Sequence, residues 1–380
     1  MVITACKEPD WETRAVLTPA VAGKLVRLGA AVQVEAGLGS SLHITDDDYV
    51  AAGATVITDM NTSLAETDVI MRLNPPDAAF VSTLRSGSVL VSFLDPFQNT
   101  TLVTSLAEKG ITSLCMELIP RSTYAQKMDA LSSQASLAGY AAVMLAAERI
   151  DKVLPMMSTP AGTISPARVF IVGVGVAGLQ AIATAKRLGA RVDAYDTRPV
   201  VEEQVQSLGA RFVKIDVGEV GQTEQGYARE LTPEQLELQR QQMIRHCAAS
   251  DIIITTAQVF GRRAPRIISA EMVAAMRPGS VIVDLAASSG GNVEATVPGE
   301  EVITNGVRII GLKSYPSLVA RDASQMYASN VFSLMEHLFD AGSGQLRLDP
   351  ESDDIVAACL LTSGGQVVHE AVRNSLEAVK

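Results

Sequence analysis

The sequence holds three glycines and an acid at the spacing of a dinucleotide-binding turn. Gly173, Gly175 and Gly178 follow the apolar stretch Arg168–Val172 and open a stretch of helical periodicity. In such a turn the first glycine permits a tight bend, the second lets backbone approach a pyrophosphate, and the third lets helix and strand pack closely. A helix that begins near Ala177 would offer free N–H groups to phosphate oxygens. A glycine triplet alone also fits an ordinary strand-to-helix turn, but here strand, helix, second strand and acid are in register.

Asp196 is the acid of this pattern, and it indicates which nucleotide to expect. It ends the second strand, 18 residues after Gly178. There a carboxylate can accept hydrogen bonds from both hydroxyls of an adenosine ribose. The same carboxylate would repel a 2′-phosphate, so NAD(H) is favoured over NADP(H). Arg198 lies close enough to serve a 2′-phosphate, but an acid at the strand end argues against that use.

The chain offers poor candidates for a group that moves protons. An oxidoreductase acting on an alcohol, hydroxy acid or amino acid needs a positioned His, Lys, Tyr or acid. The four histidines, His43, His246, His337 and His369, lie in a polar loop, on predicted helices and in the tail. Neither a Tyr-x-x-x-Lys nor a Ser-His-Asp arrangement can be identified. We expect no metal site, because the adjacent His246 and Cys247 would point about 100° apart on a helix.

A polar block from Pro120 to Gln134 contains the remaining candidates. Arg121 and Asp129 bracket Gln126 over nine residues, which is enough to close an ion-paired loop with an amide at its tip. An amide can hold a nicotinamide carboxamide or a ribose without exchanging protons. The same spacing also fits a solvated turn in which Asp129 caps a helix.

Composition predicts two domains and an acidic surface. A chain of 380 residues exceeds what one hydrophobic core usually supports. With a net charge of −11 and scattered Lys and Arg, it lacks the basic footprint of a nucleic-acid binder. The four cysteines lie far apart, which favours reduced thiols, and the N-terminus is typical of a strand rather than a signal peptide. Polar residues interrupt the uncharged run Ala130–Ala147, so we expect a buried helix and not a membrane span.

Predicted strands alternate with predicted helices, which is typical of an α/β fold. We predict two Rossmann-like, doubly wound parallel-sheet domains separated by a cleft, the first of them discontinuous. Residues 1–132 with 322–380 would form the N-terminal domain, and residues 133–321 the NAD(H)-binding domain. The expected strands are Val2–Ala5, Ala31–Glu35, Asp68–Leu73, Ser88–Phe93 and Thr112–Met116, then Arg168–Val172, Arg191–Tyr195, Arg211–Lys214, Asp251–Thr255, Ser280–Leu285 and Val307–Gly311.

Helices are expected at Thr18–Leu28, at Thr101–Lys109 with Gly110 as its C-cap, and at Ala323–Asp340. The tail holds two short apolar runs, Ile355–Leu361 and Gln366–Val368, and we expect it to return to the first domain. The polar stretch 218–230 is either a surface connector or a mobile lid.

With these motifs the chain resembles a known family, the NAD(H)-binding domain I of the proton-translocating nicotinamide nucleotide transhydrogenases. The resemblance covers essentially the whole length. Its matching pieces are K-E...E-T-R-A-V-L-T-P (residues 7–19), P-R-x(4)-Q-x-x-D-x-L-S-S (120–133), G-V-G-V-A-G-L-Q-A-I-A-T-A-K-R-L-G-A (173–190), D-T-R-P (196–199), G-Y-A-R-E (226–230), and P-G-S-V-I-V-D-L-A with G-G-N (278–292).

The resemblance implies the site residues. The Arg-Gln-Asp loop would cradle the dihydronicotinamide, with Arg121, Gln126 and Asp129 as its catalytic residues and no metal. Two positions depart from the family: Gln258 stands where Leu is frequent, and Tyr124 replaces a common Arg. The implied NAD(H)-binding residues are Arg121, Ser122, Thr123, Gln126, Lys127, Met128, Asp129, Ser132, Gly173, Gly175, Val176, Ala177, Gly178, Asp196, Thr197, Arg198, Gly226, Tyr227, Gln239 and Gln258.

The resemblance also implies the reaction and the partners. The expected activity is that of a Re/Si-specific transhydrogenase: direct hydride transfer between NADH on this chain and NADP+ on a partner domain, with the two rings about 3 to 3.5 Å apart. Membrane-spanning partners would couple the transfer to proton translocation. We therefore expect a homodimer, with 159–166 as an exchanged hairpin, docked peripherally on the cytoplasmic side of a membrane.

Two other functions remain open. Alanine dehydrogenase shares the fold and the glycine turn, but needs a substrate-binding Lys, a catalytic His and an Asp. Those positions hold Asn74, Asp95 and Ser288 here. An NAD(H)-binding module without catalysis is the second alternative.

Overall fold

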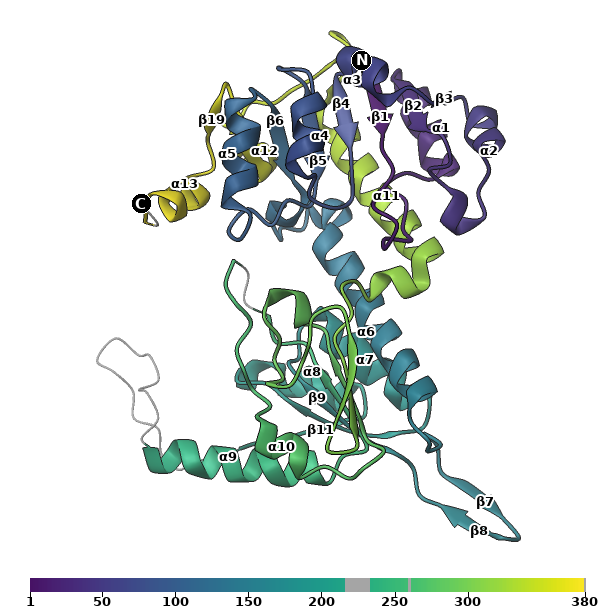
Figure 1. Cartoon of the computed structure of the whole chain (residues 1–380), viewed down its shortest axis with the longest axis vertical. Coiled ribbons are helices and arrows are strands. Elements are labelled where there is room, and N and C mark those ends of the chain that lie inside the picture. Colours follow the sequence, from purple (N-terminus) through teal and green to yellow (C-terminus); the bar gives the residue numbers. More distant parts are fainter. Residues whose placement is uncertain (216–232, 259–260, 379–380) are drawn as a thin grey trace. The chain divides into compact units, whose positions relative to one another are not determined.

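The computed structural model describes residues 1–215, 233–258 and 261–378. The chain divides into two compact units, each with its own sheet (Figure 1). Unit 1 comprises Met1–Gln134 and Pro316–Lys380, and unit 2 comprises Ala135–Tyr315. Unit 1 is thus built from two separate stretches of chain.

The sheet of unit 1 has eight strands in the order β19-β18-β6-β5-β4-β1-β2-β3. The run from β6 to β3 is parallel, whereas β18 is antiparallel to β6 and β19 to β18. The tail therefore returns to this sheet as expected, but it adds antiparallel strands. The strands are β1 (Val2–Ala5), β2 (Ala31–Glu35), β3 (Thr55–Ile57), β4 (Val69–Met71), β5 (Val89–Ser92), β6 (Thr112–Cys115), β18 (Leu360–Ser363) and β19 (Gln366–Val367).

Helices cover both faces of this sheet. In β4, Val69 and Met71 belong to one buried apolar cluster and Ile70 to another, because successive side chains of a strand point to opposite faces. The tail run that begins at Ile355 is helical as far as Cys359, since the Asp353 carboxylate caps two backbone N–H groups there. The helices are α1 (Pro19–Leu28), α2 (Asp46–Ala51), α3 (Met60–Glu66), α4 (Ala78–Thr83), α5 (Thr100–Glu108), α11 (Ala320–Leu338), α12 (Asp354–Cys359) and α13 (Glu370–Ala378).

The sheet of unit 2 has seven strands in the order β11-β10-β9-β12-β13-β15-β14. All pairs are parallel except β14 with β15. The chain runs from β9 outward through β10 and β11, then crosses to the other side of β9 to form β12. The strand order therefore reverses between β9 and β12, and in open α/β sheets ligands bind beyond the carboxyl ends of the strands at such a reversal. The strands are β9 (Arg168–Val172), β10 (Arg191–Tyr195), β11 (Arg211–Phe212), β12 (Ile252–Thr255), β13 (Val281–Asp284), β14 (Glu301–Thr304) and β15 (Val307–Ile310).

The described residues also form five further α-helices and two small antiparallel strand pairs. In β9, Val169 and Ile171 pack in one apolar cluster and Phe170 and Val172 in another, so both faces of the sheet are covered. The two-Rossmann α/β fold is confirmed. These elements are α6 (Ala130–Arg149), α7 (Val176–Arg187), α8 (Glu202–Ser207), α9 (Pro233–Ala248) and α10 (Ala270–Ala274), with β7 (Met157–Thr159) paired to β8 (Gly162–Ile164) and β16 (Phe339–Asp340) to β17 (Gln345–Leu346).

Among the described residues, α6 is the one helix that is long and apolar enough to cross a membrane. Its apolar window is 44% buried within the fold, and Ala142, Val143 and Ala146 belong to a buried apolar cluster. The opposite face is open, since Tyr140 and Met144 are exposed. The helix expected from the sequence is therefore present, with one face buried rather than all of it.

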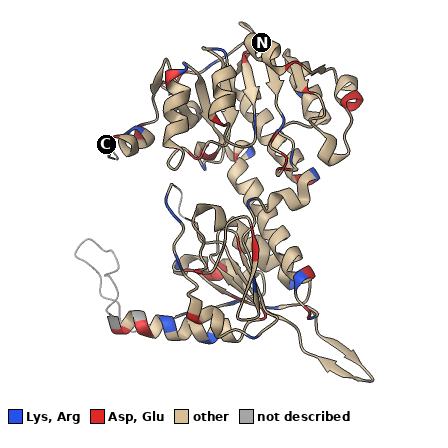
Figure 2. Ribbon diagram, in the orientation of Figure 1, with Lys and Arg blue, Asp and Glu red and all other residues tan. Residues whose placement is uncertain are grey.

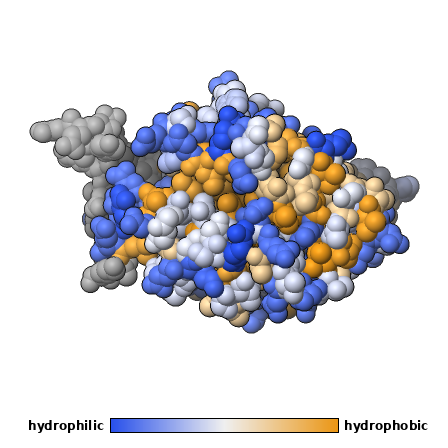
Figure 3. Space-filling model, turned by 90° about the horizontal axis from the view of Figure 1, so that it is seen from above, coloured by the Kyte–Doolittle hydropathy of each residue, from blue (hydrophilic) through white to orange (hydrophobic). Residues whose placement is uncertain are grey.

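Charged residues are distributed over both units. Figure 2 shows Lys and Arg interspersed with Asp and Glu along the described ribbon. Hydrophilic and hydrophobic residues are likewise mixed on the face drawn in Figure 3. This distribution agrees with the scattered basic residues of the sequence.

Candidate nucleotide-binding site

The glycine turn joins β9 to α7 at the point where the sheet order of unit 2 reverses. Gly173 has φ 96°, a left-handed conformation that favours glycine. A Cβ atom on Gly178 would lie 2.0 Å from the carbonyl oxygen of Gly173, so this close approach of helix and strand requires glycine. A Cβ on Gly175 would meet no atom within 4 Å. Space beside Gly175 is therefore open to a ligand.

The N-terminus of α7 is suited to an anion. Gly175 is its N-cap and has no side chain that could accept from the first-turn N–H groups. The helix dipole adds partial positive charge at this end. A phosphate placed there would gain these unsatisfied donors.

Asp196 follows β10 and is hydrogen-bonded to the turn. Its Oδ2 accepts from the backbone N–H of Val174 at 2.8 Å, and Arg198 donates to both carboxylate oxygens. Burial raises the pKa of Asp196, but the hydrogen bonds from Arg198 and Val174 outweigh it, so the net shift is downward. The carboxylate is thus ionised at neutral pH.

The loop Arg121–Asp129 belongs to unit 1. Ala125 and Met128 are buried and fix its middle, while Gln126 is exposed. Tyr124 packs edge-on against His337, with ring centroids 5.6 Å apart. The loop therefore presents its amide on a backbone that is anchored on either side.

The expected ion pair between Arg121 and Asp129 is absent from the described contacts. Asp129 instead caps α6, since its two oxygens accept from the backbone N–H and the hydroxyl of Ser132 at 2.8 and 2.6 Å. These nearby donors satisfy the carboxylate, which explains why it does not reach Arg121. The capping alternative is the one found in this structure, and Arg121 is exposed.

The other expected residues are spread over both units. Gln239 donates to the phenolic oxygen of Tyr195 at 3.2 Å, next to Asp196. Gln258 follows β12, is exposed, and donates to the carbonyl oxygen of Leu285. Gly226 and Tyr227, with the rest of the stretch 218–230, lie outside the described residues. Five more of the expected nucleotide-binding residues are exposed: Ser122, Thr123, Lys127, Thr197 and Val176.

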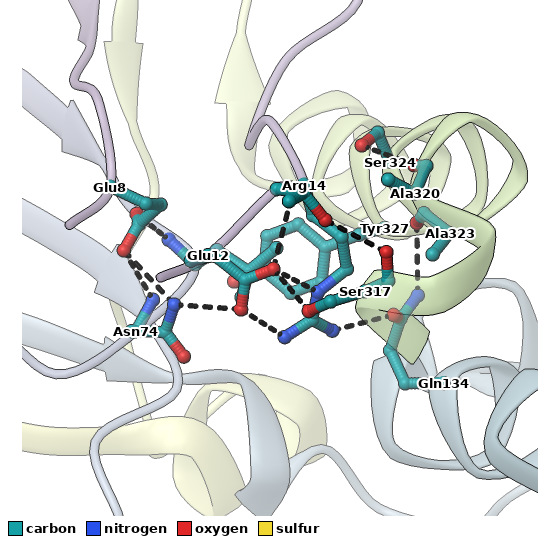
Figure 4. A network of polar contacts seen from close by, with 12 residues as sticks. Glu8, Glu12, Arg14, Asn74, Gln134, Ser317, Ala320, Ala323, Ser324 and Tyr327 are labelled. Carbon is teal, nitrogen blue, oxygen red and sulfur yellow. Dashed lines mark hydrogen bonds and ion pairs between the residues drawn. The ribbon is translucent and has the colours of Figure 1, made fainter. Parts of the chain in front are cut away.

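A buried polar network in unit 1 was missed by sequence reasoning (Figure 4). Arg14 donates to both oxygens of Glu12 and, through Nη1, to Gln134 at 2.8 Å. Asn74 donates to Glu8 and Glu12 at 3.1 and 3.2 Å. The opening motif of residues 7–19 was the available signal, because it places five charged residues between two apolar stretches.

The positions that would carry proton transfer in an alanine dehydrogenase have other roles here. The Asn74 amide is committed to the two carboxylates of that network. Asp95 is an exposed residue whose backbone has φ 45°. Partial desolvation of its carboxyl raises its pKa. Ser288 lies in a 3₁₀ turn. None of these three side chains reproduces the Lys, His and Asp set.

Gly139 is a second residue that the sequence did not reveal. A Cβ there would lie 2.1 Å from the carbonyl oxygen of Ala177, so its absence lets α6 pass close to the first turn of α7. A glycine inside an apolar helix usually has such a packing reason, and that was the available signal.

Metal and thiol chemistry find no support in the described residues. No group of three or more described His, Cys, Asp or Glu side chains could hold a metal ion. All four cysteines are buried, and burial raises the pKa of Cys6, Cys247 and Cys359 to about 12. Burial also lowers the pKa of His246, which stacks on Phe170.

Comparison with known proteins places these features in a family. Residues 5–138 match the "Alanine dehydrogenase/PNT, N-terminal domain" and residues 142–370 the "Alanine dehydrogenase/PNT, C-terminal domain". The chain is 42% identical over 368 residues to the first part of NAD(P) transhydrogenase subunit alpha of Rhodospirillum rubrum, covering 95% of this chain and 96% of that protein.

Solved structures of the same family are similar to this chain as well. A transhydrogenase from Sinorhizobium meliloti superposes with a TM-score of 0.84 at 41% identity, covering 98% of this chain and all of that one. An L-alanine dehydrogenase superposes with a TM-score of 0.83 at 25% identity over the full length of both. The chain therefore belongs to the alanine dehydrogenase/PNT family, and the transhydrogenase subunits among these relatives share more of its sequence than the alanine dehydrogenase does.

Proposed function

We propose that this chain is the NAD(H)-binding component of a transhydrogenase and that hydride passes directly from its NADH to NADP+ on a partner domain. The ionised Asp196 beside the glycine turn is the observation that carries the choice of nucleotide, because its charge disfavours a 2′-phosphate. The transhydrogenase names of the relatives support the reaction.

The reaction needs no acid or base. A hydride leaves one nicotinamide ring and reduces the other, so NADH and NADP+ give NAD+ and NADPH without release or uptake of a proton. Catalysis would rest on proximity and orientation of the two rings. The exposed Gln126 amide would hold the dihydronicotinamide, and the Asp129 cap would fix the end of its loop.

Replacement of Gln126 tests this role. In the Gln126→Ala variant, mixed with an NADP(H)-binding partner domain, we expect hydride transfer to fall by about 100-fold, because a misplaced donor ring loses most of the proximity effect. NADH affinity should stay within several-fold of wild type. Transfer to a nicotinamide analogue is followed by absorbance, and Gln206→Ala, an exposed amide on α8, is the control. Unchanged transfer in Gln126→Ala would remove the role from this residue.

The same assay separates the alternatives. Oxidative deamination of alanine without transfer between nucleotides would favour an alanine dehydrogenase, and NADH binding without either reaction would favour a binding module. Commitment of Asn74 to two carboxylates argues against the first of these.

We propose further that the chain is a homodimer, docked peripherally on membrane-spanning partners at the cytoplasmic side. The β7–β8 hairpin exposes Met157 and Ile164, 44% and 48% accessible. Met157 also lines an apolar groove of about 830 Å³, so one copy carries both an apolar hairpin and an apolar surface. The groove is also lined by Met144, Ile150, Val153, Leu154 and Leu188.

Sedimentation velocity tests the dimer. We expect the wild type to sediment as a dimer and Ile164→Asp as a folded monomer, because a carboxylate on the hairpin cannot enter an apolar contact without a large desolvation cost. Ser158→Asp, on the same hairpin but already polar, is the control. A monomeric wild type at micromolar concentration would contradict the proposal.

A further inference from the structure

The carboxylate of Asp196 is already saturated by this chain. Oδ1 accepts from the backbone N–H and the Nε of Arg198 at 2.9 and 3.0 Å. Oδ2 accepts from the backbone N–H of Val174 at 2.8 Å and from Nη2 of Arg198 at 3.1 Å. A carboxylate offers about four lone-pair positions, and all of them are used.

A ribose diol needs two of these positions. The two positions taken by backbone N–H groups are fixed by the glycine turn and by the bend that follows Asp196, so they cannot be vacated without a change of the backbone. The other two belong to the single side chain of Arg198. That side chain is 58% exposed, whereas the carboxylate is 8% exposed, so the guanidinium can leave into water while the acid stays in place.

We propose that Arg198 is an internal competitor of the nucleotide: its guanidinium occupies the ribose-binding face of Asp196 and must swing away before NAD(H) can bind. The inference rests on the proposed function, in which Asp196 holds the adenosine ribose. It changes the role of Arg198 from the direct contact expected from the sequence to a gate.

The gate is a weak one. Ion pairs with an exposed partner contribute little stability, and here one partner is largely in water. If only a minor fraction of the molecules has Arg198 turned away from Asp196, the apparent affinity for NAD(H) falls in proportion to that fraction, but the site is not blocked. Nη2 also donates to the carbonyl oxygen of Val174 at 3.3 Å, so the closed guanidinium links the acid to the glycine turn.

Removal of the guanidinium tests the gate. In Arg198→Met, which keeps a long stem and has no donors, NADH should bind about threefold to fivefold more tightly, the range expected from opening a weak ion pair. The gain should come from faster association, with dissociation unchanged, as measured by stopped-flow fluorescence of NADH on the isolated chain. Arg198→Lys keeps the charge but not the two-pronged contact, and should show a smaller gain in the same direction.

A double-mutant cycle with Asp196→Asn ties the effect to the carboxylate. In that background Arg198→Met should alter NADH affinity by less than about twofold, because an amide does not hold the guanidinium in place. NADH binding that is intact but unchanged or weakened in Arg198→Met would overturn the gate alone. If neither the wild type nor any variant binds NADH, both the gate and the proposed function would be overturned.

Discussion

The three glycines of the turn meet different physical constraints. Gly173 is held at φ 96°. Gly178 faces the carbonyl oxygen of Gly173, with no room for a Cβ. Gly175 has an extended backbone at φ −88° that any residue adopts, and open space beside it. The first two glycines are therefore required by the fold, whereas the fold does not require Gly175, which agrees with the proposed close approach of a pyrophosphate.

This difference predicts opposite outcomes for two alanine substitutions. Gly178→Ala should destabilise the fold by about 1–3 kcal/mol or more, because the added methyl group meets backbone that cannot move aside. Gly175→Ala should leave the melting temperature within about 2 °C of wild type, since a change below 0.5 kcal/mol moves it little. The same variant should weaken NADH binding at least tenfold by blocking the pyrophosphate.

Thermal unfolding and NADH titration of both variants check the assignment. Full NADH affinity in Gly175→Ala would show that the pyrophosphate does not approach there. A stable Gly178→Ala would show that helix and strand can separate at little cost.

At the site, sequence reasoning identifies residue types better than their partners. The glycine turn and Asp196 follow from spacing, because strand, turn, helix and acid occur in a fixed order. The Arg198 contact depends on a side-chain conformation, which spacing does not specify. For Asp129, spacing allowed both an ion pair and a helix cap, and the local donors of Ser132 decided in favour of the cap.

At the scale of elements, α11 holds the loop that carries Gln126. The buried side chain of Asn330 donates to the carbonyl oxygen of Lys127 at 2.9 Å and accepts from the hydroxyl of Ser133 at 2.7 Å. Lys127 also pairs with Glu336 at 3.7 Å. Through Asn330, α11 thus fixes the end of the loop and the start of α6 together, while Gln126 stays exposed.

Some strands and helices could be predicted from the sequence, and others could not. Strands β1 and β9 are short apolar runs, and β2 and β10 alternate buried with less buried residues; all four match their predicted bounds. Strand β14 (Glu301–Thr304) was not predicted, because it lies at a sheet edge and only partly buries its side chains. In the tail, apolar character alone did not distinguish strand from helix; the Asp353 cap did.

At the scale of the whole molecule, the network around Glu12 joins distant parts of unit 1. Arg14 connects Glu12 to Gln134, at the beginning of α6. Gln134 donates to the carbonyl oxygen of Ala323 in α11, and Ser317 donates to Glu12 at 2.6 Å. Hydrogen bonds around one buried ion pair therefore link the N-terminal segment, the middle and the tail of the chain, and they add to the strand pairing that joins the two stretches of unit 1.

Glu12 should make the stability of unit 1 depend on pH in a defined direction. Burial raises its pKa, but the hydrogen bonds from Arg14 and Ser317 outweigh it, so the folded pKa lies below the ordinary 4.5. Such a group stabilises the fold above about pH 4.5, and this contribution is lost as the pH falls through the lowered pKa of the folded state.

Glu12→Gln should therefore lower the free energy of unfolding by about 3 kcal/mol at pH 7, because it leaves Arg14 without its charge partner. Its difference from wild type should shrink below pH 4.5 in urea unfolding. Glu66→Gln, an exposed carboxylate on α3, should show no such trend, and a constant difference for Glu12→Gln at every pH would mean that its charge does not stabilise the unit.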